Sequence, residues 1–108
     1  MSIIKYNKLV RDRIPEIIEN TGKHCVCSTL SEDEYIKLLD AKLNEELAEY
    51  QESKSMEELA DLLEVIRAVA IVRGSSYEEI EKIRNKKASQ RGGFDRRIQL
   101  IEVDDCEG

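Results

Sequence analysis

Apolar and polar residues recur at helical intervals through the middle of the chain. Between Tyr35 and Tyr50 the apolar side chains fill one arc of a helical wheel and most polar ones fill the opposite arc. Ser31 with Glu34 three residues later is a capping box, which begins a helix expected to reach about Gln51. The pattern predicts one long amphipathic helix in this region.

Two more helices begin at capping boxes later in the chain. The first is expected to reach Arg73 and to stop at Gly74, and the second is expected to end before Gly92. Their serine–glutamate pairs are Ser55 with Glu58 and Ser76 with Glu79.

The remaining segments predict shorter elements. Pro15 suits the first turn of a short helix that Gly22 closes. Residues 24–30 alternate like a strand, and residues 97–103 alternate weakly and are able to pair with them. We therefore expect an all-α fold, mainly a helical bundle, in a single domain over residues 1–108, with room for one small β-hairpin.

The segment from Leu59 to Val72 predicts self-association. Its polar residues are Asp61, Glu64 and Arg67, so the helix is apolar nearly all round. Such a helix must be covered on every side, and a chain of 108 residues has few other helices to cover it. We expect a homodimer or a homotetramer that shares this helix in a bundle.

Composition narrows the location and the class of protein. No apolar run is long enough to span a bilayer, and the first residues do not form a signal peptide. Three cysteines without a secretory signal indicate a reducing compartment. These features predict a soluble cytoplasmic protein with no membrane partner.

Charge is unevenly distributed along the chain. The net charge of −6 argues against binding to duplex nucleic acid. Residues 32–64 hold twelve acidic residues and three lysines, whereas residues 5–13 and 84–97 carry net charges of +3 and +5. An acidic centre between basic segments suits a metal ion and a polyanionic small ligand. Solvated helix faces alone would also account for these charges.

Four acidic residues occupy unexpected positions. On the wheel, Glu46 falls within the apolar arc and Glu49 towards one side of it, while Glu58 and Asp61 share a face with Val65. Burying a carboxylate costs several kcal/mol, on the order of its desolvation penalty, unless a cation compensates it. In an antiparallel hairpin of these two helices, Glu49 and Glu58 face each other at one height.

Glu46 and Asp61 face each other one step further along the same hairpin. Clustered carboxylates of this kind call for Mg²⁺ or Mn²⁺. Glu58 as the capping partner of Ser55, on an ordinary acidic surface, is the alternative.

Three segments carry a resemblance to a known family. Glu45-Glu46-Leu47-Ala48-Glu49 followed by Glu58-Leu59-Ala60-Asp61 resembles the EExxE…ExxD signature of the MazG-like all-α nucleoside triphosphate pyrophosphohydrolases. Residues 6–16 and 86–94 are similar to a small subgroup labelled phosphoribosyl-ATP pyrophosphohydrolase-like. Only eight residues separate Glu49 from Glu58, fewer than the motif usually has, which implies a tight hairpin and less room for a base-recognition loop.

The resemblance implies an activity and its residues. It implies Mg²⁺, with Mn²⁺ as a substitute, and cleavage of a nucleotide between its α and β phosphates to a monophosphate and pyrophosphate. Glu45 or Glu49 is the candidate to accept the proton of the attacking water. The implied metal ligands are Glu46, Glu49, Glu58 and Asp61.

Basic residues are candidates for phosphate contacts. Arginine forks suit phosphate oxygens, although basic residues near the end of a helix also complement its dipole. Lys8 and Arg11 are expected to reach the triphosphate, a neighbouring subunit or only surface carboxylates. The other candidates are Lys86, Lys87, Arg91 and Arg97.

The alternative function is a non-catalytic helical module for nucleotide binding or assembly. Such a module has no need of charge at positions 46, 49, 58 and 61, because apolar residues replace buried ions at little or no cost in stability. The acidic quartet therefore favours an enzyme.

Overall fold

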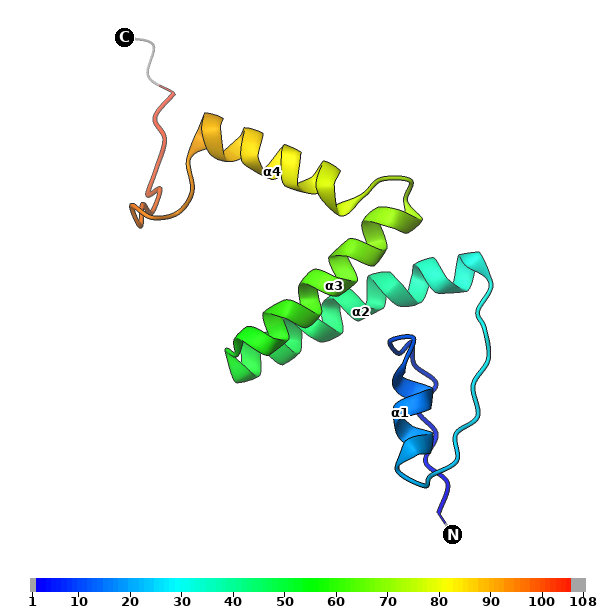
Figure 1. Ribbon diagram of the computed structural model, residues 1–108. Coiled ribbons are helices and arrows are strands. Elements are labelled where there is room, and N and C mark those ends of the chain that lie inside the picture. Colours follow the sequence, from blue (N-terminus) through cyan, green and yellow to red (C-terminus); the bar gives the residue numbers. More distant parts are fainter. Residues whose placement is uncertain (1, 106–108) are drawn as a thin grey trace. The chain divides into compact units, whose positions relative to one another are not determined.

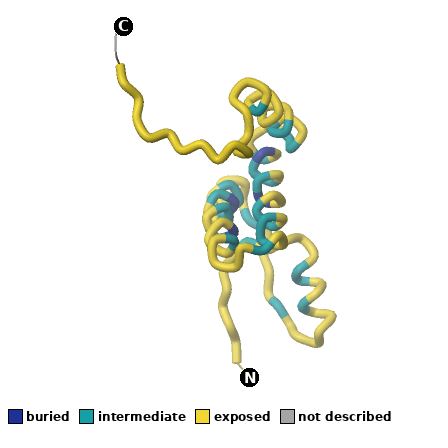
Figure 2. Tube along the Cα trace, turned by 90° about the vertical axis from the view of Figure 1, so that its left-hand side faces the viewer, coloured by how far each residue is buried: buried dark blue, intermediate teal, exposed yellow. Residues whose placement is uncertain are grey.

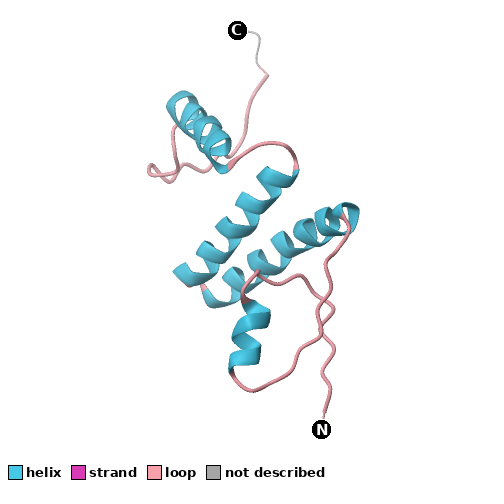
Figure 3. Ribbon diagram, turned by 45° about the vertical axis from the view of Figure 1, so that its right-hand side comes forward, coloured by secondary structure: helices cyan, strands magenta, loops and turns pink. Residues whose placement is uncertain are grey.

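A computed structural model describes residues 2–105 of the chain, and its regular elements are helices. No strand is present among these residues (Figure 3), so the predicted all-α fold is confirmed. The helices, in chain order, are α1 (Ile14–Asn20), α2 (Glu32–Ser53), α3 (Met56–Val72) and α4 (Tyr77–Arg91) (Figure 1).

The small β-hairpin allowed by the sequence is absent. Residues 24–30 and 97–103 form no ladder, and the apolar side chains of Val26 and Leu100 are 90% and 76% exposed. A strand is stabilised by cross-strand pairs and by burial of one face, and an alternating pattern supplies neither without a partner. The expectation of strands at these two segments was therefore wrong.

Serine caps begin both long helices where the sequence predicts them. The Ser31 hydroxyl accepts a hydrogen bond from the backbone N–H of Glu34, at 3.3 Å, and the Ser55 hydroxyl accepts one from that of Glu58, also at 3.3 Å. Between the helices Lys54 adopts a left-handed conformation, with φ of 57°, and its N–H donates to the carbonyl of Tyr50 at 2.7 Å. The connection is therefore a tight, hydrogen-bonded turn.

Helices α2 and α3 pack against each other as a hairpin, and within the described residues α1 packs against neither of them. The buried apolar residues are Leu39 on α2 with Val65 and Ala70 on α3, and the rest of the tube is largely intermediate or exposed (Figure 2). An ion pair of 2.8 Å between Arg73 and Asp40 joins the end of α3 to the first half of α2. This hairpin positions the acidic residues.

Within one chain, α3 is not covered on every side, although its apolar sequence predicts that it is. On α3, Leu63 and Ile71 are 49% and 53% exposed. A shallow hollow of about 220 Å³ on this helix is lined by Ala60, Leu63, Glu64, Arg67 and Tyr77. None of the helices within residues 2–105 has the length and apolar content needed to cross a membrane.

The chain divides into two compact units, Met1–Tyr77 and Glu78–Gly108. The first contains α1, α2 and α3. The second contains most of α4 and the segment that follows, in which the backbone N–H of Arg97 donates to the carbonyl of Phe94 at 3.0 Å. A single domain over residues 1–108 stays a prediction.

Candidate metal centre

Glu46 is the buried charged residue of the α2–α3 hairpin. Its side chain is 8% exposed, and its Oε1 lies 3.5 Å from Nζ of Lys42, one turn earlier on α2. Its other oxygen, Oε2, is buried and has no hydrogen-bond partner. The wheel had placed this residue among the apolar positions, and the structure buries it there.

Glu46 belongs to two triads of carboxylates. Oxygens of Glu45, Glu46 and Glu49 lie within 4.8 Å of one another, and so do oxygens of Glu46, Glu58 and Asp61. The first triad lies on α2 alone, whereas the second crosses from α2 to α3. The predicted hairpin register thus brings all four predicted ligands and Glu45 into one acidic cluster.

The turn between the helices frees the carboxylate of Glu58. In a complete capping box that carboxylate would accept from the backbone N–H of Ser55. Here the hydroxyl of Ser53 accepts from this N–H, at 3.2 Å. Oε2 of Glu58 is instead buried without a hydrogen-bond partner. Its backbone therefore serves the cap while its side chain belongs to the acidic cluster.

Burial and mutual repulsion favour protons on two of these carboxylates. Burial raises the pKa of Glu46, the neighbouring Glu49 raises it further, and Lys42 opposes both effects. The pKa of Glu58 is also raised, first by desolvation, then by the charge of Glu49 and by a hydrogen bond to Glu49 that only protonated Glu58 donates, and then by the charge of Asp61. Without a cation, the cluster therefore opposes full ionisation.

Three cations of this chain partly neutralise the cluster. Lys42, with its side chain 16% exposed, lies 3.5 Å from both Glu45 and Glu46. From the segment before α1, Lys8 lies 3.6 Å from Glu45 and Arg11 donates to Oδ1 of Asp61 at 2.6 Å. Lys42 is absent from the sequence-based candidates, although its spacing of three and four residues from the two glutamates was a signal.

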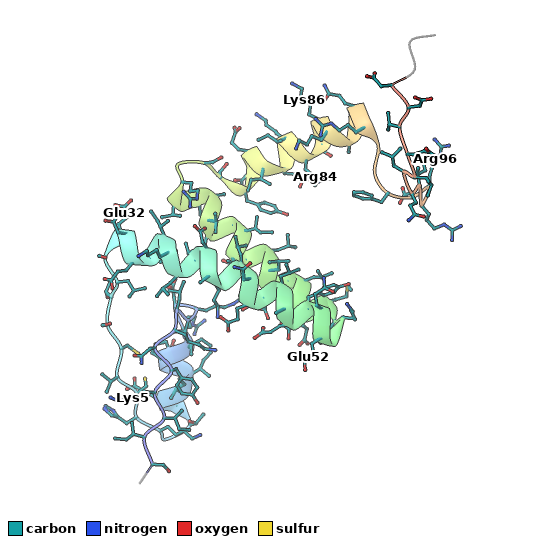
Figure 4. The ribbon with its side chains drawn as sticks, turned by 180° about the vertical axis from the view of Figure 1, so that it is seen from behind. Lys5, Glu32, Glu52, Arg84, Lys86 and Arg96 are labelled. Carbon is teal, nitrogen blue, oxygen red and sulfur yellow. The ribbon has the colours of Figure 1, made fainter. Side chains whose placement is uncertain are left out.

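The other predicted phosphate contacts belong to the second unit. Lys86 and Lys87 are exposed on α4, and Figure 4 labels Lys86 there together with Arg96 in the segment beyond the helix. Arg91 and Arg97 line a hollow of about 510 Å³ formed by residues 91–98. Both arginines line this one hollow, and their contact with phosphate stays a prediction.

The donor set of the cluster fits a hard divalent cation. Every ligand atom in the two triads is a carboxylate oxygen, which is the donor that Mg²⁺ and Mn²⁺ prefer. Two of these oxygens are buried and unpartnered, so a cation would supply the interaction that they lack. Glu49 is exposed, which leaves one side of the cluster open to water and a ligand.

Comparisons with other proteins give a partial match. A stretch of 42 residues, 39% of this chain, is 62% identical to an uncharacterized protein of Mycolicibacterium smegmatis (strain ATCC 700084 / mc(2)155). The match covers 43% of that protein, so the chain spans less than half the length of the curated relative. No protein-family model and no solved structure matches the chain.

Proposed function

We propose that this protein is a Mg²⁺-dependent nucleotide pyrophosphohydrolase of the MazG-like type, which cleaves a nucleoside triphosphate or related nucleotide between its α and β phosphates. The observation that carries the proposal is the pair of buried oxygens, Oε2 of Glu46 and Oε2 of Glu58, that lack partners within one acidic cluster. The three sequence segments that resemble the family support it.

A purely structural role explains these oxygens poorly. A buried polar group without a partner costs about 1–3 kcal/mol, and more when it is charged. Leucine or alanine at the same positions would avoid that cost and strengthen a small core. A divalent cation held by Glu46, Glu49, Glu58 and Asp61 would offset the desolvation and the repulsion together.

Two residues of the cluster are candidates to accept a proton in this reaction, and one of them, Glu49, is also a proposed metal ligand. Mg²⁺ held by these carboxylates would neutralise phosphate oxygens and lower the pKa of a water molecule. Glu49 is exposed and therefore accessible to the proton of that water. Glu45 is the second candidate, and its carboxylate lies 3.6 Å from Lys8 and 3.5 Å from Lys42.

Two basic residues lie beside the proposed metal site. Lys8 and Arg11 are at the acidic cluster, where the phosphates of a metal-bound nucleotide would approach. For Lys86, Lys87, Arg91 and Arg97, contact with phosphate is proposed from the sequence resemblance alone. The substrate is a free nucleotide and not duplex nucleic acid, and the compartment is the cytoplasm.

Self-association is part of the proposal. The half-exposed Leu63 and Ile71 on α3 would be covered by a second copy of the chain in a homodimer or homotetramer. Such an arrangement adds helices around the hairpin, whose own buried apolar core is limited to Leu39, Val65 and Ala70 among the described residues.

The test is pyrophosphate release from a panel of NTPs, dNTPs and phosphoribosyl-ATP, with Mg²⁺, with Mn²⁺ and with EDTA. Glu49→Gln and Glu58→Gln should abolish release. Glu52→Gln is the matched control, because Glu52 lies exposed near the end of α2 outside both triads (Figure 4).

Each result has a distinct meaning. Release that requires the metal and survives only in the control establishes the enzyme. A folded protein that binds Mn²⁺ and nucleotide without releasing pyrophosphate would instead be a nucleotide-binding module. Absence of both binding and release would leave an assembly module, for which the exposed apolar face of α3 is the supporting observation.

A further inference from the structure

The segment before α1 contacts both triads of the acidic cluster. Lys8 lies 3.6 Å from Glu45, an outer member of the triad on α2. Three residues later, Arg11 bonds at 2.6 Å to Asp61, the member of the second triad that comes from α3. The carbonyl of Arg11 accepts a hydrogen bond from the N–H of Ile14 at 3.1 Å, which ties this residue to the start of α1.

The cations at the cluster differ in burial. The side chains of Lys42 and Glu46 are 16% and 8% exposed, so this pair is a fixed part of the hairpin. Those of Arg11 and Asp61 are 56% and 42% exposed. Exposed ion pairs contribute little free energy and exchange readily with other ions. Arg11 is therefore an exchangeable counter-ion, whereas Lys42 is a resident one.

We propose that Arg11 is a switching residue. In the metal-free protein its guanidinium is hydrogen-bonded to Asp61, and it moves to a phosphate of the substrate when Asp61 binds the metal ion. This inference rests on the proposed function. A guanidinium forks onto phosphate as well as onto carboxylate, so one side chain serves both states. Metal and nucleotide then bind cooperatively. The metal displaces Arg11 from Asp61 and makes it available to the phosphate, and the phosphate draws Arg11 away from Asp61 and makes that carboxylate available to the metal.

Competition at Asp61 predicts opposite changes in metal affinity and nucleotide affinity when Arg11 is replaced. While Arg11 donates to Oδ1 of Asp61, it competes with a cation for that oxygen and repels the cation by its charge. Removing the guanidinium should therefore strengthen binding of metal alone. The same change should weaken binding of nucleotide, since a hydrogen-bonded charge on the phosphate is lost. A residue that only supports the fold would weaken both.

The experiment is calorimetric titration of the full chain with Mn²⁺, with and without the α,β-methylene analogue of ATP, for the wild type, Arg11→Gln and Arg13→Gln. Arg13 is the matched control, because it lies two residues away, is 81% exposed and pairs with Glu16 on α1. Arg11→Lys, which keeps the charge but loses the fork, is measured as well. It takes the place of Arg11→Gln if that variant does not fold.

We expect Arg11→Gln to bind Mn²⁺ alone about two- to fivefold more tightly than the wild type, in line with the worth of an exposed ion pair. It should bind the analogue about tenfold more weakly in the presence of Mn²⁺. Arg11→Lys should weaken binding of the analogue in the same direction, and Arg13→Gln should resemble the wild type.

Two outcomes overturn the inference separately from the proposed function. Equal Mn²⁺ affinity in Arg11→Gln and the wild type, or an equal gain in Arg13→Gln, would exclude competition at Asp61. An unchanged affinity of either Arg11 variant for the analogue would exclude transfer to phosphate. Absence of Mn²⁺ binding by the wild type would instead contradict the metal site itself.

Discussion

Lys42 and Glu46 form an ion pair of 3.5 Å within one turn of α2, and both side chains are largely buried. The pair engages one oxygen of the carboxylate and leaves the other, Oε2, buried without a partner. A single lysine thus pairs with one oxygen of a carboxylate that shares its two triads with four others. Repulsion between carboxylates and desolvation of Glu46 therefore destabilise the metal-free hairpin, and a bound cation would reduce both effects.

Neutralising Glu46 should stabilise the metal-free protein. Glu46→Gln removes a charge that is repelled by Glu49 and Asp61 and is poorly solvated, so we expect a thermal midpoint several degrees higher in EDTA. The stabilisation that we expect Mn²⁺ to give the wild type should disappear in this variant. Calorimetric scans with EDTA and with Mn²⁺ check both points, and Glu52→Gln is the control. A lower midpoint in EDTA would show that Lys42 already compensates the charge.

The metal-free protein should lose stability as pH rises above about 4.5, the ordinary pKa of glutamate. The pKa values of Glu46 and Glu58 are raised in the folded state, so over this range the folded protein holds more protons than the unfolded chain. By linkage, stability falls with pH until both raised pKa values are passed.

Urea unfolding at a series of pH values in EDTA measures this dependence. The double variant Glu46→Gln/Glu58→Gln should be much less sensitive to pH. On α4, the pKa of Glu81 is lowered by its hydrogen bonds with Arg84, so its small contribution is lost as pH falls. Stability of the wild type that stays constant between pH 4 and 8 would contradict the prediction.

Truncating the buried leucine of α2 should strongly destabilise the hairpin. Leu39 is 4% exposed, so Leu39→Ala should lower the free energy of unfolding by about 2–4 kcal/mol through lost burial and a cavity. Ile17→Ala, at a half-exposed position on α1, should cost less than about 1 kcal/mol. Urea titration of both variants in EDTA compares them, and equal losses would mean that α2 and α3 do not form the stable core.

Removing either serine cap should lower stability by a similar amount, but only one of the two changes should weaken metal binding. Ser31→Ala and Ser55→Ala each remove a cap, at a cost of about 1 kcal/mol in the free energy of unfolding. Ser55→Ala alone should also weaken Mn²⁺ binding, because Ser55 fixes the turn that carries Glu58. Calorimetric titration checks the difference, and the same Mn²⁺ affinity in both variants would show that the cap does not position Glu58.

A charge on the exposed face of α3 should dissociate the proposed oligomer. Leu63 is 49% exposed in one chain, so Leu63→Glu should leave the helix content unchanged while converting a dimer or tetramer to a monomer. Sedimentation velocity measures the change, with Ile83→Glu on α4 as the matched control. An unaltered oligomer would place the interface elsewhere.

Helix boundaries were predictable because each signal is local. Ser31 and Ser55 cap the helices that they were expected to begin, and the helix expected to end before Gly92 ends at Arg91. The capping hydrogen bonds involve residues three positions apart, so no distant contact is needed to form them. The failed strands at residues 24–30 and 97–103 needed a partner that the alternating pattern does not specify.

The acidic cluster was predictable for a related reason. Two periodic helices joined by a short turn have their register set by the turn, so Glu46 and Asp61 could be placed opposite each other before any coordinates. The contacts of Lys8 and Arg11 with the acidic cluster could not be predicted in this way, because the segment before α1 has no periodicity that fixes its path. In the cap of α3, the Ser53 hydroxyl takes the place of the Glu58 carboxylate as acceptor for the backbone N–H of Ser55. The spacing of the motif does not predict this replacement.

The two-residue connection, Lys54 and Ser55, joins two helices on which the spacing of the acidic residues is as important as their identity. One residue inserted within α2 between Glu46 and Glu49 would turn Glu49 by about 100° around the helix and direct it away from the cluster. Most substitutions in the turn would be mild by comparison, since only the left-handed Lys54 has an unusual backbone. A relative with a longer connection would therefore keep this centre only if it also keeps the three-residue spacings from Glu46 to Glu49 and from Glu58 to Asp61, so alignments should be judged by those spacings.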